Sequence, residues 1–331
     1  MSRKPPHDDN GKERIAKVMA RAGLCSRREA ETWIAAGRVA VNGKRLSTPA
    51  FTVSPSDRIE VDGKSLPGRE RTRLFLYHKP KGLVTTNRDE RGRPTIFGAL
   101  PKDLPRLMSI GRLDINSEGL LLLTNDGGLA RALELPQTGW LRRYRVRANG
   151  KVTQAALDRL GRGITVEGVE YGPIEAKLDR EQGSNLWLTM GLREGKNREV
   201  RNVLRELGLS VNRLIRISYG PFRLGELAPA AVEEVKTRVL REQIGEKIER
   251  LAGTDFSAPL REPEDAPPQK SPRPSSAASR LKSGSPDFRS SKTNSSKPEF
   301  GKASRSSPSS PPARGRWNSK RNAARDRTPR R

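Results

Sequence analysis

The chain has 331 residues, which allows two domains and a sizeable buried core, and its 65 Lys and Arg residues against 38 Asp and Glu residues give a net charge of +27. Such a surplus favours a polyanionic partner, and RNA, DNA and acidic membranes all fit that description. No apolar run approaches the roughly 18 residues of a membrane span or resembles a secretory signal, and the single cysteine, Cys25, forms no zinc-ligand cluster with His7 and His78. We therefore expect a soluble, cytoplasmic protein without a metal site.

Two helices followed by a small sheet are predicted for residues 13–63. Apolar residues spaced three or four apart form one helix face, and Gly23 follows where that helix would end. The members of this face are Ile15, Val18, Met19 and Ala22. The segment from Ser26 to Glu29 has the pattern of a capping box, which starts a second helix that Gly37 would end. Two later Gly-containing turns separate short alternating strands.

A second domain is predicted for residues 73–240, after a polar linker at residues 64–72. Alternating or compact apolar runs predict strands at residues 74–77, 120–124, 144–147 and 186–190. Helical spacing predicts helices at residues 153–160, capped by Thr153, and at residues 197–207. Several turns between strands are too short for crossover helices, so the sheet should be mixed and mostly antiparallel, and the fold class is α+β.

The last segment, residues 252–331, has a different composition. It contains 18 Lys and Arg residues against 7 Asp and Glu residues, with 17 Ser and 12 Pro, and only two leucines as branched aliphatics. Such a segment buries too little apolar area to offset its chain entropy, which predicts a disordered basic tail. The tail carries +11 of the net charge of +27, so +16 remains on the rest of the chain.

From the residues alone, nucleic-acid binding is well supported and catalysis is not. The second domain contains no Ser-His-Asp set, no glycine-rich phosphate loop and no metal cluster. What remains is Asp114, two residues from Arg112 in a glycine-bounded loop that leads into an apolar strand. Without further information, Asp114 is more simply explained as a residue that shapes the loop.

The run AGLCSRREAETWIAAGRVAVNGK, within residues 13–63, resembles the S4 RNA-binding module of ribosomal proteins and RNA-modifying enzymes. In that family the first two helices present basic side chains to RNA. The resemblance implies phosphate contacts for six residues, each of which could otherwise belong to a solvated helix face. They are Arg14, Lys17, Arg21, Arg27, Arg28 and Arg38.

The run GRLDINSEGLLLLTNDG, residues 111–127, closely resembles the catalytic motif of pseudouridine synthases, in the branch that acts on single ribosomal-RNA uridines and carries an S4 module. Three other segments resemble the same branch in the same order: HKPKGLVTT, WLRRYRV and REGKNREVRNVLRELGLSVNRLIRISYGPF. The resemblance implies that Asp114 is the nucleophile and that no cofactor, metal or redox agent is needed. Attack at C6 of the base and attack at C1′ of the ribose are both compatible with the sequence.

The resemblance also implies roles for residues around Asp114. Tyr144 would stack on the flipped base and help remove the C5 proton, and Leu214 would pack beneath the base. Arg201 would pair with Asp114 and keep it ionised. Their alternative roles are a core tyrosine, a core leucine and a surface arginine.

Three further residues are expected to contact the RNA. Arg112 would enter the space that the flipped nucleotide leaves, where a guanidinium can bond to phosphates. Lys79 and Lys81 would position the RNA backbone.

The rival hypotheses are a non-catalytic RNA-binding or ribosome-assembly protein and another RNA-modifying enzyme, such as a methyltransferase, for which the sequence offers no nucleotide-cofactor turn. Only the set of Asp114, Tyr144 and Arg201 separates the first rival from an enzyme. The form of residues 197–201 is most like the B-type enzymes that modify large-subunit RNA, although the same reaction on small-subunit RNA stays open.

We expect a monomer whose partners are ribosomal RNA and pre-ribosomal particles, with no membrane. The tail is expected to add salt-sensitive RNA affinity, which deletion of residues 252–331 would test.

Overall fold

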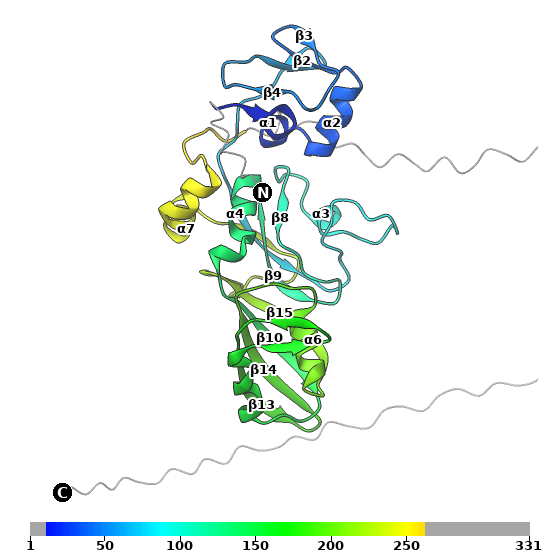
Figure 1. Cartoon of the computed structure of the whole chain (residues 1–331), viewed down its shortest axis with the longest axis vertical. Coiled ribbons are helices and arrows are strands. Elements are labelled where there is room, and N and C mark those ends of the chain that lie inside the picture. Colours follow the sequence, from blue (N-terminus) through cyan, green and yellow to red (C-terminus); the bar gives the residue numbers. More distant parts are fainter. Residues whose placement is uncertain (1–10, 262–331) are drawn as a thin grey trace, which may run out of the picture. The chain divides into compact units, whose positions relative to one another are not determined.

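The computed structural model describes residues 11–261, so most of the predicted tail, residues 262–331, lies outside the described residues. Its elements form two sets, in residues 11–66 and in residues 72–261 (Figure 1). No helix in the described part of the chain has the length and apolar character needed to cross a membrane.

The N-terminal domain contains two helices, a four-stranded sheet with the order β3-β2-β5-β6, and a two-stranded ribbon of β1 and β4. Its elements are β1 (Glu13–Arg14), α1 (Ile15–Arg21), α2 (Arg27–Ala35), β2 (Val39–Val41), β3 (Lys44–Arg45), β4 (Thr52–Val53), β5 (Ile59–Val61) and β6 (Lys64–Ser65). The predicted capping box is confirmed, because the Ser26 hydroxyl accepts from Glu29 N–H and the Glu29 carboxylate accepts from Ser26 N–H. Ile15, Met19 and Ile34 are fully buried in its core. The predicted order of two helices and a small sheet is therefore confirmed.

The second domain is built on a nine-stranded sheet. Its elements are β7 (Leu74–Lys79), α3 (Ile96–Ala99), β8 (Met108–Ile110), β9 (Glu118–Thr124), α4 (Gly127–Glu134), η1 (Pro136–Thr138), β10 (Arg142–Asn149), α5 (Gln154–Asp158), η2 (Arg159–Arg162), β11 (Ile164–Val166), β12 (Val169–Tyr171), β13 (Ile174–Gln182), β14 (Asn185–Leu192), α6 (Glu199–Glu206), β15 (Ser210–Tyr219), β16 (Phe222–Arg223), β17 (Val232–Glu234) and α7 (Thr237–Ala252). The strand order is β13-β14-β10-β15-β9-β7-β17, with β8 beside β9 and β16 beside β15. Figure 1 labels β13, β14, β10, β15 and β9, which follow one another in this order. In the described residues, β15 and β9 are the one parallel pair of this sheet, so the predicted mixed, mostly antiparallel α+β fold is confirmed.

Strand β9 lies between two hydrophobic cores. Leu121 and Leu123 contribute to the first core, which also contains residues of β10, β14, α5 and α6. Leu120 and Leu122 contribute to the second core, where α4 and α7 pack. Strand β10 differs, because its residues alternate between buried and exposed over its whole length. The sheet is therefore covered on both faces at β9 but on only one face at β10.

Three features of the second domain differ from the sequence-based expectations. The Asn125-Asp126-Gly127 segment, predicted as a turn, starts helix α4, because the Asp126 carboxylate accepts from the N–H groups of Gly128 and Leu129. Helix α6 begins two residues later than predicted, after Arg198, whose φ of +50° is not helical. Helix α7 was not predicted, and its buried residues belong to the second core: Leu240, Ile244, Ile248 and Ala252.

The chain beyond α7 returns to the start of the second domain. Thr72 N–H donates to Asp255 O at 2.7 Å, and Asp255 N–H donates to the Thr72 hydroxyl at 3.1 Å. Phe256 packs against the second core. Packed structure therefore continues past residue 252, where the sequence predicted that a disordered tail would begin.

Candidate active site

Asp114 lies in the loop between β8 and β9, residues 111–117, which is called the Asp114 loop here. Four carbonyl groups of this loop accept hydrogen bonds from other segments of the chain. The pairs are Thr85 Oγ1 to Leu113 O (2.8 Å), Gly82 N to Ile115 O (2.8 Å), Arg201 Nη2 to Asn116 O (3.1 Å) and Lys79 Nζ to Ser117 O (2.9 Å). The Asp114 side chain itself is 35% exposed. The loop therefore presents a solvent-accessible carboxylate from a firmly held backbone.

Arg198 is the ion-pair partner of Asp114, with its Nη1 3.7 Å from Asp114 Oδ2. It directly precedes helix α6 and has left-handed backbone angles, φ +50° and ψ +28°, which a non-glycine residue adopts uncommonly. The sequence interpretation assigned no role to Arg198. The signal that could have identified it is its place in the same motif segment, residues 197–201.

Arg201 does not form the ion pair that was predicted for it. Its guanidinium donates to Val211 O and to Asn116 O, each at 3.1 Å. Burial and the positive charge of Arg198 lower the pKa of Arg201, while the negative charge of Asp114 opposes this shift. The Arg201 guanidinium is therefore near enough to Asp114 to interact with its charge. Two backbone carbonyls lie within reach of the half-buried guanidinium, so Arg201 holds the backbone of the Asp114 loop and not the Asp114 carboxylate.

Tyr144 and Leu214 lie on the adjacent strands β10 and β15. Val146 is paired with Leu214, and Tyr144 lies two residues before Val146 on the same face of β10. Tyr144 is 8% exposed and Leu214 is 5% exposed, and both belong to the first core together with Leu113 of the Asp114 loop. The structure thus buries both residues in the core that also contains Leu113, the neighbour of Asp114 in the chain. Their contact with a base stays a prediction.

Lys79 cannot contact an RNA backbone in the way the sequence suggested, because its side chain is fully buried at the end of β7. Its Nζ donates to Pro80 O at 3.0 Å and to Ser117 O at 2.9 Å. Burial lowers the pKa of Lys79 to about 8, although the negative charges of Asp114 and Glu118 act to raise it. Lys79 is therefore a support for the Asp114 loop.

Arg112 and Lys81 are the predicted RNA-contacting residues near Asp114 that are accessible. Arg112 is exposed on the Asp114 loop. Lys81 is 48% exposed and lies 3.3 Å from Glu118, which also pairs with Arg213 at 3.0 Å. Their contact with RNA stays a prediction.

Glu199 is a buried carboxyl that the sequence interpretation missed. It is 3% exposed in the first turn of α6, next to Arg198, and its Oε2 accepts from Lys196 N–H at 2.9 Å. Its Oε1 has no hydrogen-bond partner in the part of the chain that the structure describes. Burial raises the pKa of Glu199 to about 7, and the neighbouring charge of Glu194 adds to the increase.

This raised pKa predicts a pH-dependent stability. The folded protein holds the Glu199 proton more tightly than the unfolded chain, whose pKa is near 4.5, so the contribution to stability is full below about pH 4.5 and is lost as pH rises through about 7. Glu199→Gln cannot ionise, and we expect it to gain about 1 to 3 kcal/mol in unfolding free energy relative to the wild type between about pH 5 and pH 8. Denaturant unfolding at a series of pH values measures this difference. Glu206→Gln, an exposed change on the same helix, is the control, and an equal gain in both variants would contradict the prediction.

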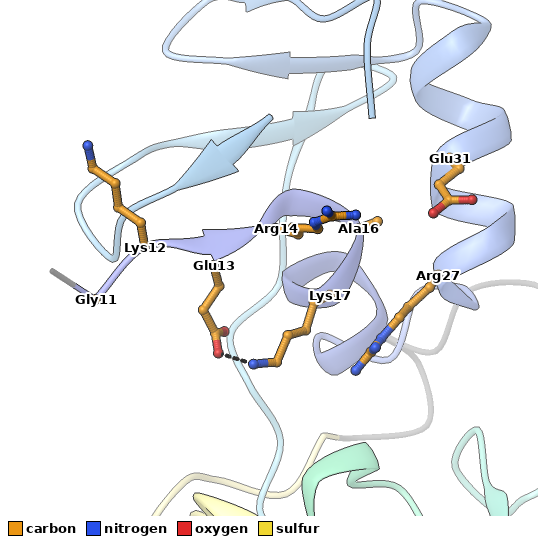
Figure 2. Close-up of a pocket in the computed structure, with 8 residues that line it drawn as sticks. All are labelled: Gly11, Lys12, Glu13, Arg14, Ala16, Lys17, Arg27 and Glu31. Carbon is orange, nitrogen blue, oxygen red and sulfur yellow. Dashed lines mark hydrogen bonds and ion pairs between the residues drawn. The ribbon is translucent and has the colours of Figure 1, made fainter. Parts of the chain in front are cut away.

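In the N-terminal domain, three of the six predicted RNA-binding residues line one groove. The groove has a volume of about 600 Å³ and is bounded by residues of β1, α1 and α2 (Figure 2). Its lining residues are Gly11, Lys12, Glu13, Arg14, Ala16, Lys17, Arg27 and Glu31. Lys12 is a member that the sequence interpretation missed. Lys17 lies 2.5 Å from Glu13, whereas Arg14 and Arg27 are exposed.

The other three predicted residues of this domain lie outside the groove lining. Arg28 is exposed on α2, and Arg21 pairs with Glu13 at 2.8 Å. Arg38 donates from Nε to Asp62 at 2.9 Å and lies 4.7 Å over the Trp33 ring. Arg38 therefore has a structural role in joining α2 to the sheet, whatever its contact with RNA.

The chain matches two family models. Residues 13–59 match the S4 domain, and residues 73–206 match the RNA pseudouridylate synthase family. An uncharacterized RNA pseudouridine synthase of Rickettsia felis is 46% identical over 69% of this chain and 99% of its own length. The ribosomal large subunit pseudouridine synthase B of Pseudomonas aeruginosa is 38% identical over 94% of this chain and 80% of its own. A crystal structure of a pseudouridylate synthase is 27% identical over 72% of this chain and 99% of its own, with a TM-score of 0.49.

Proposed function

This chain belongs to the RNA pseudouridylate synthase family, and we propose that it converts a uridine of large-subunit ribosomal RNA to pseudouridine, with Asp114 as the nucleophile. The observation that carries the proposal is the Asp114 loop, in which four carbonyl groups are held by other segments while the Asp114 carboxylate stays accessible beside Arg198. A positioned carboxylate is a suitable covalent catalyst.

The reaction rearranges the uridine without loss of atoms. The bond between ribose C1′ and N1 of the base breaks, a bond between C1′ and C5 forms, one proton leaves C5, and N1 gains a proton. Asp114 supplies the electron pair that opens the reaction, and Arg198 orients its carboxylate. Arg201 keeps the backbone of the Asp114 loop in place. We assign the flipped base to Tyr144, on strand β10 next to β15, which pairs with the start of β9 directly after the loop.

Substrate binding requires that the target base leave its stack, which costs a few kcal/mol. We assign Arg112 to the vacated position, because it is exposed on the same loop as Asp114. Tyr144 and Leu214 form the apolar surface for the extruded base, and the groove of the S4 domain binds the RNA through phosphate contacts. A ribosomal RNA substrate also implies a cytoplasmic location and contact with pre-ribosomal particles.

The test of this function is a map of pseudouridines in ribosomal RNA from three strains: one with the intact gene, one with the gene deleted, and one with Asp114→Asn. We expect one or a few sites in large-subunit RNA to vanish in both the deletion and the Asp114→Asn strain. Loss in the deletion with survival in the Asp114→Asn strain would refute the role of Asp114. No change in the deletion would favour a non-catalytic RNA-binding protein, and loss in small-subunit RNA would reassign the substrate.

The buried Lys79 gives a further prediction. Lys79→Met removes both of its hydrogen bonds and leaves the carbonyls of Pro80 and Ser117 without this donor, so we expect a loss of about 1 to 3 kcal/mol in stability. The loosened Asp114 loop should lower kcat by about tenfold with a smaller change in KM. Single-turnover and steady-state kinetics measure both constants. Lys81→Met, an exposed neighbour, should mainly raise KM, and the opposite pattern in the two variants would contradict the assignment.

A further inference from the structure

Strand β10, which carries Tyr144, and its neighbours β14 and β13 have a second face that no helix among residues 11–261 covers. On β10, the residues that alternate with the buried ones are exposed, and three of them are arginines: Arg143, Arg145 and Arg147. On the neighbouring strands, β14 and β13, the residues in register with them also point away from the first core. This face is therefore open to solvent in the described part of the chain, while its reverse is packed.

The strand register places the side chains of this face in three rows. In the first row, Arg143 of β10 lies opposite Gly191 of β14, which lies opposite Glu175 of β13, and Arg143 pairs with Glu175 at 3.4 Å. The other two rows contain cations at both ends. The second row consists of Arg145, Thr189 and Lys177, and the third row consists of Arg147, Trp187 and Arg180. We call these two rows the outer basic face.

The four cations of the outer basic face have no acidic partner within 4 Å among residues 11–261. This distinguishes them from Arg143, Arg205 and Arg213, which each pair with a glutamate. The acid nearby, Asp179, accepts a hydrogen bond from Thr189 at 2.8 Å. Neighbouring like charges on a sheet repel one another, so binding of an anionic partner would remove an electrostatic repulsion that is present in the free protein.

The face also contains an aromatic ring among its cations. The Arg145 guanidinium lies 4.9 Å over the ring of Trp187, which is partly exposed. Arginines beside an accessible aromatic ring are the chemistry that binds nucleic acid, because the cations contact phosphates and the ring offers a stacking surface. Alternate residues of a strand are about 7 Å apart, so the cations form a compact patch.

We infer that the outer basic face is a second RNA-binding surface, which contacts the phosphate backbone of ribosomal RNA outside the target nucleotide. The inference rests on the proposed function for the identity of the RNA. Because β10 carries Tyr144 on its other face, the two RNA contacts would be separated by the thickness of a single sheet. A substrate long enough to pass around the edge strand β13 would reach both, whereas a short hairpin would reach only one.

The test compares the full-length chain with Arg145→Gln/Arg147→Gln, using a transcript of complete large-subunit ribosomal RNA. We expect the dissociation constant to rise by about fivefold or more near 0.1 M salt, and the slope of log K against log salt to fall by about two, one for each lost phosphate contact. The control is Arg159→Gln/Arg162→Gln, which removes the same charge from exposed residues of η2, on the opposite side of the sheet. This control should change the dissociation constant less than twofold.

Three outcomes would overturn the inference: unchanged affinity and slope in the β10 variant, equal losses in the two variants, or a loss confined to binding of polyglutamate, which would indicate an acidic protein partner. If the β10 variant unfolds at a lower temperature than the wild type, Lys177→Gln/Arg180→Gln on the edge strand provides the same measurement. Arg145→Lys/Arg147→Lys should retain the salt slope. The proposed function fails separately, if the Asp114→Asn strain keeps its pseudouridines.

Discussion

Asp114→Asn is expected to lower the rate of pseudouridine formation by a factor on the order of 10⁴ or more, because an amide lacks the negative charge and the nucleophilic electron pair of the carboxylate. The substitution replaces one carboxylate oxygen by an NH2 group, and the hydrogen bonds that hold the Asp114 loop are accepted by its backbone carbonyls and persist. The structure and RNA affinity should therefore change little. Release of tritium from RNA labelled at uridine C5 measures the rate, since the C5 proton is lost in each turnover.

Glu118→Gln is the matched control for this variant. Glu118 is a second carboxylate directly after the same loop, but it pairs with Lys81 and Arg213. Partial burial acts to raise the pKa of Glu118, but the two cations outweigh this effect, and the pKa is lowered. Both oxygens of Glu118 accept hydrogen bonds from Arg213, whereas Asp114 has a single ion pair at 3.7 Å, so Glu118 is the poorer nucleophile. We expect Glu118→Gln to retain a rate within about tenfold of the wild type. Comparable losses in the two variants would count against Asp114 as the nucleophile.

Gly119→Ala is expected to be the most destabilising single change near the site. Gly119 follows the Asp114 loop at the point where β9 pairs with β15, and its φ is +101°. An added Cβ would lie 2.3 Å from Arg216 O and 2.7 Å from Arg216 N, so the two parallel strands would have to separate. We expect a loss of about 3 kcal/mol or more, or a fall of about 6 to 12 °C in Tm.

Gly111→Ala separates the steric effect from backbone strain. Gly111 lies at the start of the Asp114 loop and also has positive φ, +69°, but no atom of the described residues lies within 4 Å of the position that an added Cβ would take. It should cost only about 1 kcal/mol. Differential scanning calorimetry of the two variants measures the difference. Equal Tm values would show that strands β9 and β15 can move apart at little cost.

The sequence predicted the elements whose signals are local. The Ser26 capping box, the Thr153 cap of α5 and the strands β7, β9, β10 and β14 all form where expected, because side-chain periodicity and caps act within a few residues. Helix α4 was missed because Asn125-Asp126-Gly127 favours a turn, and only the apolar spacing after it indicates a helix.

The contacts within the site depend on tertiary structure and could not be predicted in the same way. Lys79, next to a proline in a basic segment, has the sequence features of a surface residue, yet it is buried because Ser117, 38 residues later, offers a carbonyl. Arg198 and Arg201 are three residues apart on the same segment. Which of them faces the Asp114 carboxylate depends on the left-handed backbone of Arg198. An arginine at that position does not predict this conformation.

The hydrogen bonds between Thr72 and Asp255 have a consequence for how this domain can be rebuilt. Because they hold the first and last segments of the second domain side by side, its chain is nearly a closed circle. A short peptide could join the two ends, and new termini could be opened in an exposed turn such as the one at Gly183, between β13 and β14. A circularly permuted enzyme of this kind would keep the Asp114 loop and its supports, and its catalytic unit could be spliced into another RNA-binding protein without an extended linker.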